Sequence, residues 1–446
     1  MKRKEYGPFT LFLCLILIVF ILFAPYFLVK PKFDEIIDKV FRREIKWKGI
    51  ITIWDYPRLD ITTGYKYSWL RNKIEEFEKK HPGVFIEFKA LDPDFGHIEI
   101  ETAIKTNTYP DIAPIGTDYE IISKGILVPL DQYITEEEME EYKIQAISSV
   151  KYNGHIWGIP YMMEPYSLFL NLDIFNQMNV DPPKNGNWTY SEFVETLKKL
   201  TYDKNKNGKP EIYGFNSYIA PNSYNAFGII LSDGGEIVDR ETLKYKFYGD
   251  KAVAGLKKLV DLKLKHKVTP ENFGANSEKE AFRNFVIDKK VAVYPAKSST
   301  VNSLKILSRN GKGFNFGVAN YPIGELDMPI SSGNLVTAYG IFKQTDEKKL
   351  EMCIEFIKHL TDDESQKELY KQGVFSVKKN VGNIYKNDEI MQKIEKSLPY
   401  SKPIGIHPKW RLVDDILQSQ IRMALLGKKT AKEAIEEAKT KIKAVE

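Results

Sequence analysis

A loop at residues 203–211 carries the kind of side chains that could hold a calcium ion. Its oxygen-bearing residues fall at positions one, three, five and nine of a calcium-loop pattern and are Asp203, Asn205, Asn207 and Glu211. Gly208 stands at position six, where such loops turn sharply, and Lys209 at position seven would offer its backbone carbonyl. Position twelve holds Gly214 instead of the bidentate Glu of an EF-hand. The sequence therefore predicts a possible calcium site, with a solvated turn rich in Asn and Gly as the alternative.

Carboxylates are the other side chains that could carry chemistry, as the acid and base of a glycosidase. Asp55, Asp118 and Glu164 are candidates, but no catalytic motif surrounds them and the chain holds 60 acidic residues. The two cysteines cannot form a disulfide framework or a cysteine-rich metal cluster. Cys353 lies on the apolar stripe of a predicted helix, which indicates a buried structural thiol.

The charge balance argues against a protein that binds nucleic acid. Residues 1–45 hold eight basic and five acidic side chains, so the remaining chain carries 57 basic and 55 acidic ones. A nucleic-acid binder needs a basic stripe to displace counterions from phosphates, and these totals offer no excess for one. With 43% hydrophobic and 28% charged residues, the chain is predicted to be globular, with about two or three domains.

The N-terminus has the layout of a membrane anchor. Phe9–Val29 is a stretch of 21 residues without charge. At about 1.5 Å per residue, such a helix crosses a hydrocarbon core of about 30 Å. The basic residues 2–4 favour a cytoplasmic N-terminus, with the rest of the chain outside. A cleaved signal peptide is the alternative, although residues 22–24 fit a cleavage site poorly. Residues 1–45 are thus predicted to be an anchor, or signal, and a stalk.

The elements that must position any site begin with a βαβ unit. A strand is predicted at 50–54, a helix at 69–80 and a second strand at 84–88, which indicates a parallel sheet covered by helices. Ligands of such sheets bind at the carboxyl ends of the strands, so the loop at 54–58 is the first candidate. Further along, Thr189 and Glu192 have the spacing of a capping box, beside Trp188 and Phe193 as a hydrophobic staple. The spacing of a capping box recurs at Thr361 and at Thr430, each followed by a Glu three residues later.

An ordered series of motifs resembles one known family. Residues 152–161 (YNGHIWGIPY) are followed by 168–175 (LFLNLDIF), Pro182-Pro183 and the Trp188–Phe193 segment. The series resembles the extracellular solute-binding proteins of carbohydrate ABC transporters, the group that includes maltose-binding protein. His155 departs from the family pattern, which has lysine there. Shorter matches continue the series over about residues 48–446, at 110–112 (PDI), 125–130 (GILVPL), 233–235 (DGG) and 356–361 (FIKHLT).

The resemblance implies an α/β fold of two lobes, periplasmic-binding-protein-like, joined by hinge crossings and preceded here by the N-terminal transmembrane helix. The first lobe is expected at 46–159 plus 296–340, and the second at 160–295 plus 341–446. A ligand binds in the cleft and the lobes close over it. The implied partners are permease subunits in the membrane and a separate ATPase, because no P-loop pattern occurs in this chain.

The resemblance also implies a set of ligand-binding residues. Aromatic rings cover the apolar faces of sugars, and carboxylates or amides bind the hydroxyls. Asp118, Glu164 and Tyr224 align with ligand-binding positions of relatives, and the others lie at expected strand ends or loops. Residues 295–299 lack the tryptophan that many relatives place in the cleft, which argues against a maltodextrin. The expected residues are Trp54, Asp55, Tyr56, Asp118, Tyr161, Glu164, Tyr166, Tyr224 and Asn334, although Trp54 could instead pack under its lobe and Asn334 could form a plain turn.

The predicted function is a non-enzymatic, membrane-anchored receptor outside the cytoplasm. It would capture a sugar or oligosaccharide for an ABC importer and would need no cofactor except the possible calcium ion. Two alternatives remain: a module that reports a ligand to a membrane signalling partner, and an extracellular glycosidase.

Overall fold

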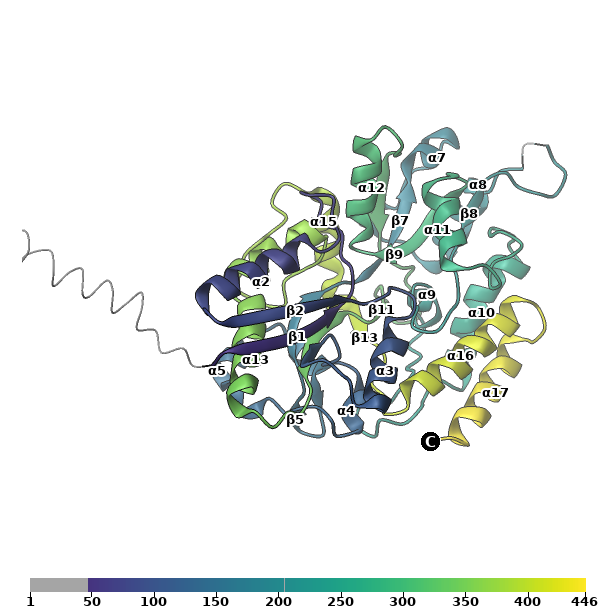
Figure 1. The fold of residues 1–446 in the computed structure, drawn as a ribbon. Coiled ribbons are helices and arrows are strands. Elements are labelled where there is room, and N and C mark those ends of the chain that lie inside the picture. The colour runs from purple at the N-terminus through teal and green to yellow at the C-terminus, as the bar shows by residue number, and fades with distance from the viewer. Residues whose placement is uncertain (1–46, 204) are drawn as a thin grey trace, which may run out of the picture.

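The computed structural model describes residues 47–203 and 205–446 and arranges them around two main β-sheets (Figure 1). The first sheet has the order β2-β1-β3-β12-β6. Its strands are β1 (Gly49–Asp55), β2 (Val84–Ala90), β3 (Ile112–Ala113), β6 (Ile159–Met163) and β12 (Val336–Ile341). β1 pairs in parallel with β2 and β3, whereas β12 is antiparallel to β3 and β6. The parallel βαβ unit predicted at the start of this sheet is confirmed.

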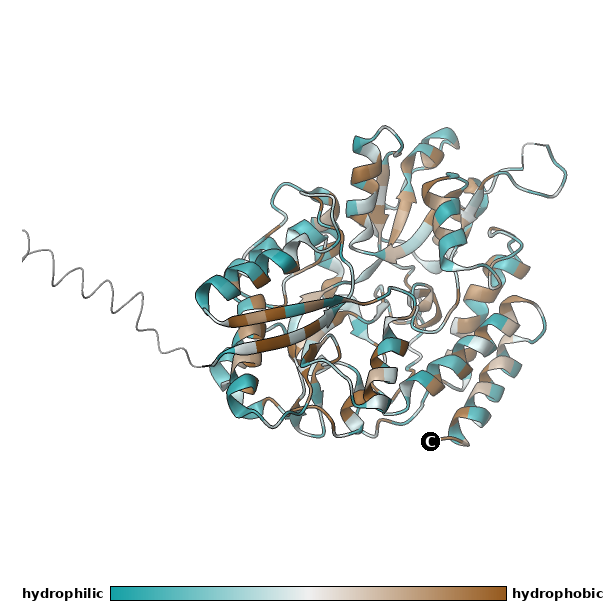
Figure 2. Cartoon of the chain, viewed as in Figure 1, coloured by the Kyte–Doolittle hydropathy of each residue, from teal (hydrophilic) through white to brown (hydrophobic). Residues whose placement is uncertain are grey.

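Alternation of side chains explains how the first sheet acquires its core. Ile51 and Ile53 are fully buried on one face of β1, where Phe77 of α2 (Ser68–Lys80) also packs. α13 (Glu347–Leu360) covers the same face, with the Phe356 ring 5.0 Å from that of Phe77. In Figure 2, β1 and β2 are largely apolar whereas α2 is largely hydrophilic, as expected for a surface helix. The other elements that accompany the first sheet, on one face or the other, are α3 (Gly96–Thr106), α4 (Tyr119–Ser123), α5 (Glu136–Glu140), α6 (Ile144–Ser149), α14 (Asp363–Lys367) and the hairpin of β4 (Lys151–Tyr152) and β5 (His155–Ile156).

The second sheet is buried on both faces. Its order is β10-β7-β9-β8, and all six residues of β7 are buried. Phe169 points to one core and Leu168 and Leu170 to the other, as the alternation of a strand requires. The strands are β7 (Tyr166–Asn171), β8 (Tyr213–Phe215), β9 (Val291–Lys297) and β10 (Phe316–Ala319). The helices on this side are α7 (Leu172–Gln177), α8 (Tyr190–Leu200), α9 (Phe227–Ile230), α10 (Asp250–Leu264), α11 (Glu278–Val286), α12 (Thr300–Arg309), α15 (Glu389–Ser397), α16 (Trp410–Leu425) and α17 (Ala431–Lys443).

The chain passes between the two sheets more than once. β6 leads directly through Glu164 and Pro165 into β7, and the chain returns after β11 (Ser331–Gly333). β11 pairs in parallel with β13 (Ser401–Pro403), so two distant segments lie side by side at the crossings. Gly333 is required there, because an added Cβ would lie 2.5 Å from the Tyr166 ring.

Two elements, β10 and α13, associate with a different sheet from the one that the expected lobe boundaries assign to them. β10 was expected with the first lobe, but its hydrogen-bonded partner is β7 of the second sheet. α13 was expected with the second lobe, but its apolar face packs on α2 and β1 of the first sheet. We propose bounds that follow the sheets, with the first lobe at 47–163 plus 335–385 and the second at 165–334 plus 389–446.

Two of the three predicted capping boxes are confirmed. Thr189 begins α8 and Thr430 begins α17, each with the reciprocal bonds of a capping box. The staple also forms, with the Trp188 and Phe193 rings 4.9 Å apart. The third prediction is wrong, because Asp362 caps α14 while the Thr361 hydroxyl donates to the Ile357 carbonyl at the end of α13.

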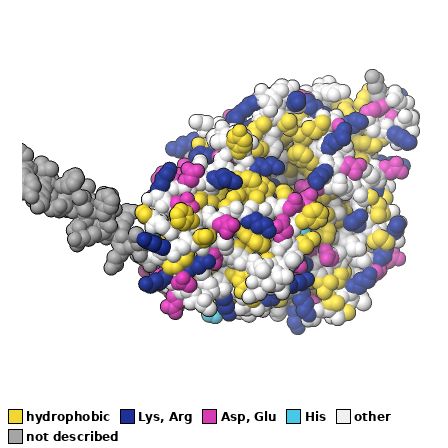
Figure 3. All heavy atoms as spheres, in the orientation of Figure 1, with side chains coloured by type: hydrophobic (Ala, Val, Ile, Leu, Met, Phe, Trp, Pro, Cys, Tyr) yellow, Lys and Arg dark blue, Asp and Glu magenta, His cyan; other side chains and the backbone are white. Residues whose placement is uncertain are grey.

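The predicted anchor at 9–29 lies outside the described residues. Among the helices of residues 47–203 and 205–446, none has both the length and the apolarity needed to cross a membrane. Cys353 is fully buried, as predicted, and burial raises the pKa of its thiol to about 12. Figure 3 shows basic and acidic side chains mixed over the visible face of the molecule, which agrees with the near balance of charges in the sequence.

Candidate functional site

Strand ends from the two sheets meet at the crossings and bring together several of the expected ligand residues. Asp55 ends β1, and Tyr161 lies in β6. Glu164 follows β6, and Tyr166 begins β7. Asp55 and Glu164 therefore lie at the carboxyl ends of strands, where ligands of open α/β sheets bind, and Tyr161 and Tyr166 lie on either side of Glu164 in the chain.

The Asp55 carboxylate is the centre of a fixed polar cluster. It is 3% exposed and accepts hydrogen bonds from Arg58 Nη1 (2.9 Å), Tyr339 Oη (2.7 Å) and the backbone N–H of Tyr56 (2.8 Å). The Tyr161 ring stacks on that of Tyr339 at 4.5 Å, and the Arg58 guanidinium lies 5.3 Å from the Tyr161 ring centroid. Burial raises the pKa values of both phenols well above the usual range, so they remain hydrogen-bond donors. The cluster is preorganised and its charge is paired.

An ion pair spans the first crossing. Glu164 Oε2 lies 3.7 Å from Lys297 Nζ at the end of β9, and the Glu164 side chain is 14% exposed. Lys297 Nζ lies 6.0 Å from the centroid of the Tyr166 ring, which is itself buried against Gly333. Because Glu164 follows the first sheet and Lys297 belongs to the second, this pair links the two lobes.

We call the boundary between the lobes, where the Asp55 cluster and the Glu164–Lys297 pair lie, the seam. A groove of about 640 Å³ lies between the lobes further along this seam. α3 and α4 line it from the first lobe, and residues 221–222 and α16 line it from the second. Arg411 crosses the seam and contacts Glu101 (2.7 Å), Asp118 (2.8 Å) and Glu120 (3.1 Å). Asp118 also caps α4 by accepting the Ile121 N–H. Burial raises the pKa of Asp118, an effect that Arg411 opposes.

Tyr56 lies between the Asp55 cluster and this groove. Burial raises the pKa of its phenol to about 12, and the Asp55 charge acts in the same direction, whereas the charge of Arg411 opposes the rise. The ring packs against Gly96 at the start of α3, where a Cβ would lie 2.6 Å from it. Tyr56 therefore connects the two parts of the seam on the first-lobe side.

Tyr224 and Asp414 form a second buried cluster, beside the groove on the second-lobe side. The Tyr224 hydroxyl accepts from Trp410 Nε1 (2.8 Å) and donates to Asp414 (3.2 Å). Asp414 also accepts the Asn222 N–H at 2.7 Å, and no cation contacts it among the interactions of the described residues. Burial raises the pKa of Asp414 to about 7. Tyr224 and Trp410 are thus buried behind this part of the groove, where they support Asp414, which lines it.

Two expected ligand residues take part in none of these contacts. Trp54 precedes Asp55 in β1 and so points to the opposite face of the sheet, where Lys89 Nζ lies 3.9 Å from its ring centroid. It lines a separate surface groove with residues of α3. Asn334 is exposed in the turn after β11. Their roles as ligand contacts remain predictions, and the positions favour the packing and turn alternatives.

The candidate calcium loop is held by its own hydrogen bonds. Asp203 accepts the backbone N–H groups of Asn207 (3.2 Å) and Gly208 (2.7 Å). The Asn205 amide donates to Glu211 (2.7 Å), so its nitrogen and not its oxygen faces that carboxylate. Asn207 accepts the N–H of Lys209 at 2.9 Å, and within the described residues no group of three His, Cys, Asp or Glu could hold a metal. Calcium binding remains a prediction, and these internal hydrogen bonds favour the alternative of a solvated turn.

A further hollow of about 410 Å³ lies between α6, residues 231–240 and residues 401–406. None of the expected ligand residues lines this hollow, and none lines the groove of about 640 Å³ either, but that groove lies along the seam where seven of the nine make the contacts described above. We therefore place the candidate site at the seam.

Sequence reasoning missed several residues of the seam. Arg58 lies in the loop at 54–58, which the strand pattern had indicated, but nothing in its type marked it as the partner of Asp55. Lys297 ends a strand and stands among the residues where a tryptophan was expected. Trp410, Arg411 and Asp414 begin a late helix that reaches the seam only through the tertiary fold, so no local signal could have identified them.

Comparisons with known proteins agree with this architecture. The family model described as bacterial extracellular solute-binding protein matches residues 73–393. Among curated proteins, the chain is similar to the maltotriose-binding protein of Pyrococcus abyssi, with 28% identity over 156 residues, 34% of this chain and 32% of that protein. The match thus spans about a third of that relative. A putative binding protein of Brucella abortus is 23% identical over 378 residues, which cover 83% of this chain and 87% of that protein.

Among solved structures, the chain is similar to an ABC substrate-binding protein from Listeria monocytogenes in complex with cycloalternan. The TM-score is 0.74 at 19% identity, over 90% of this chain and 99% of that chain. The similarity confirms the predicted α/β fold of two lobes, and the family match confirms the resemblance seen in the motifs. The matched family and these relatives are binding proteins and not enzymes.

Proposed function

Because the chain belongs to the family of bacterial extracellular solute-binding proteins, we propose that it binds a sugar or oligosaccharide between its lobes and delivers it to an ABC importer. The binding part would lie outside the cytoplasm, held at the membrane by the predicted anchor at residues 9–29. The permease subunits and the ATPase would be separate chains.

The observation that carries the proposal is the groove of about 640 Å³ with residues from both lobes on its walls. Glu120 of α4 lines it from one side, and Asn222 and Asp414 line it from the other. A ligand favours the closed state only if it contacts both lobes, because closure depends on a difference in affinity between the two states. A groove with walls from each lobe supports this requirement.

The chemistry of the seam supports a neutral hydroxylated ligand. The charges of Asp55 and Glu164 are already paired with Arg58 and Lys297, so they present hydrogen-bonding groups without a large net charge. Tyr56 is partly exposed on the seam and offers a ring suited to the apolar face of a sugar, whereas no aromatic side chain of the described residues lines the groove itself. The names of two similar proteins, which bind maltotriose and cycloalternan, agree with this class.

The test is a binding measurement on the full chain with maltotriose, cellotriose, galactose and glycerol 3-phosphate. A ligand at 100 times its dissociation constant stabilises the folded state by about 2.7 kcal/mol and so raises the melting temperature. We expect at least one neutral sugar to produce such a rise, and calorimetry to confirm one site.

Variants locate the site. Trp410→Phe removes the N–H that fixes Tyr224, and we expect weaker sugar binding. Tyr202→Phe is the control, because Tyr202 is 40% exposed and lies outside the seam. Failure of every neutral sugar to shift the melting temperature would contradict the proposed ligand class, and equal effects of the two variants would contradict the location.

A further inference from the structure

A small recess lies beside the carboxyl end of β1, next to the Asp55 cluster. Its volume is about 10 Å³, and Asp55, Arg58, Trp69, Tyr161 and Gln372 are among the residues that line it. A space of this size holds about one water-sized group. The recess is therefore too small for a sugar ring but large enough for one oxygen atom of a ligand.

Three buried polar atoms around this recess have no hydrogen-bond partner in the protein. They are Trp69 Nε1, Tyr161 Oη and Gln372 Oε1, on side chains that belong to residues 4%, 1% and 3% exposed. Buried polar groups in folded proteins almost always have a partner. The indole N–H can only donate, the amide oxygen can only accept, and the phenol can do both. The missing partner must therefore both donate and accept.

The charges around the recess indicate that a neutral hydroxyl fits it better than an anion or a cation does. Arg58 pairs with Asp55 at 2.9 Å, so the two charges compensate each other. An anion would meet the Asp55 carboxylate and the Gln372 oxygen, and a cation would meet Arg58 and the Trp69 N–H. A hydroxyl avoids both conflicts, because it accepts from Trp69 and donates to Gln372.

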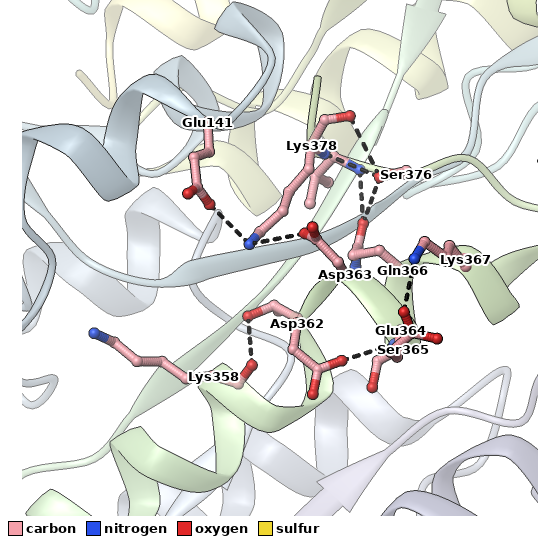
Figure 4. A network of polar contacts seen from close by, with 12 residues as sticks. Glu141, Lys358, Asp362, Asp363, Glu364, Ser365, Gln366, Lys367, Ser376 and Lys378 are labelled. Carbon is pink, nitrogen blue, oxygen red and sulfur yellow. Dashed lines mark hydrogen bonds and ion pairs between the residues drawn. The ribbon is translucent and has the colours of Figure 1, made fainter. Parts of the chain in front are cut away.

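The walls of the recess are held in place by a buried network on the first lobe. Gln366 Nε2 donates to the Tyr161 carbonyl at 2.7 Å. Gln366 Oε1 accepts from Ser376 Oγ (2.8 Å) and from the Val377 N–H (3.0 Å), and Figure 4 shows the contact between Gln366 and Ser376. Tyr161 and the segment that follows Gln372 are thereby fixed relative to each other.

The second lobe contacts the backbone on both sides of the recess. Asn302 of α12 donates to the Leu59 carbonyl (3.2 Å) and to the Lys371 carbonyl (2.9 Å), each next to a residue that lines the recess. Ser298 Oγ donates to the Gly373 carbonyl at 2.9 Å. The recess thus lies in the first lobe, next to backbone that the second lobe contacts.

We infer that this recess is a subsite for one hydroxyl group of the bound sugar, with Trp69, Tyr161 and Gln372 as its recognition groups. The inference rests on the proposed function and adds a requirement to it: the ligand must carry a hydroxyl at the position that enters the recess.

The experiment compares sugar binding by the full chain and two variants. Trp69→Phe removes the indole donor and Gln372→Met removes the amide acceptor, each with little change in size. Isothermal titration uses whichever of maltotriose, cellotriose and galactose binds the unaltered chain, together with its monodeoxy analogues. We expect each variant to weaken binding about fivefold to tenfold, the range for one lost hydrogen bond. One monodeoxy analogue should bind the unaltered chain more weakly by a similar factor and should lose no further affinity in Trp69→Phe.

The matched control is Trp188→Phe, because Trp188 is also buried but donates to Asn320 in the second lobe. Circular dichroism and melting temperature establish that each variant is folded. If the unaltered chain binds a sugar but Trp69→Phe and Gln372→Met bind it equally well, the recess holds only solvent and the subsite is refuted while the proposed function stands. If no sugar binds the unaltered chain, the proposed function fails and the subsite falls with it.

Discussion

Arg411 joins the lobes more firmly than any exposed ion pair can. From the start of α16 in the second lobe, its guanidinium contacts Glu101, Asp118 and Glu120 of the first lobe at 2.7, 2.8 and 3.1 Å. Arg411→Gln keeps a polar side chain but removes the charge. Three carboxylates are then left close together without their shared cation.

The expected loss in the free energy of unfolding follows from the partial burial of Arg411 and its three partners. The Arg411 side chain is 21% exposed and its three partners are 25%, 29% and 23% exposed. Removing one member of a fully buried pair costs about 3–5 kcal/mol, whereas exposed pairs contribute about 0–1 kcal/mol. For groups about a quarter exposed we expect a loss of about 2–3 kcal/mol in the free energy of unfolding. Screening by 1 M salt should reduce the loss, because the groups remain partly solvated.

The assay is urea unfolding of the full chain at low and high salt. Lys279→Gln is the matched control, since Lys279 also bridges the lobes through Asp94 (3.0 Å) but is 85% exposed. We expect no measurable change for the control. A control variant that is as destabilised as Arg411→Gln, or an Arg411→Gln variant as stable as the unaltered chain, would refute the reasoning from burial.

Four further predictions follow from the same structure. Because Asp414 has a pKa of about 7 when folded and about 3.9 when unfolded, the folded state holds the proton more tightly and stability falls as pH rises through this range, by up to about 1.4 kcal/mol per unit. Melting temperatures at pH 5.5 and 8.5 should therefore differ less in Asp414→Asn than in the exposed control Asp327→Asn. Thr189→Ala removes the capping box of α8 and should cost about 1 kcal/mol in urea unfolding, whereas an unchanged midpoint would count against the cap. Calcium should leave the melting temperature unchanged, because Asp203 already accepts two backbone N–H groups, and a rise would restore the calcium prediction. Cys353 should react with a thiol reagent only on unfolding in a Cys14→Ser background, since its thiol is buried, and reaction with the native chain would contradict that burial.

Much of the fold could be predicted because its signals are local. The first βαβ unit follows from short apolar strands around one amphipathic helix, and the boxes at Thr189 and Thr430 follow from side chains three residues apart. The lobe bounds could not be predicted in the same way. Whether β10 pairs with β7 or with the first sheet depends on contacts between segments more than a hundred residues apart. Thr361 shows a local signal overruled by its neighbour, because Asp362 offers a better cap to α14.

In the candidate site too, local signals predicted some positions, whereas contacts between distant segments set the others. Asp55 was expected at a strand end and lies there, but strict alternation along β1 carries Trp54 to the opposite face. The expectation that Asp118 lies at the cleft agrees with its place on the seam, while its partner Arg411 lies 293 residues away. Such partners are set by tertiary packing, and no pattern near either residue indicates them.

Gly333 has a consequence for attempts to alter what the protein binds. Even the smallest side chain there would collide with the Tyr166 ring, so a change at this position would displace an aromatic group without touching any ligand. A library of variants that includes position 333 would therefore confuse losses caused by steric collision with losses of recognition. Diversity is better introduced at exposed Asn334, one residue further along, where the backbone strand and the ring can stay as they are.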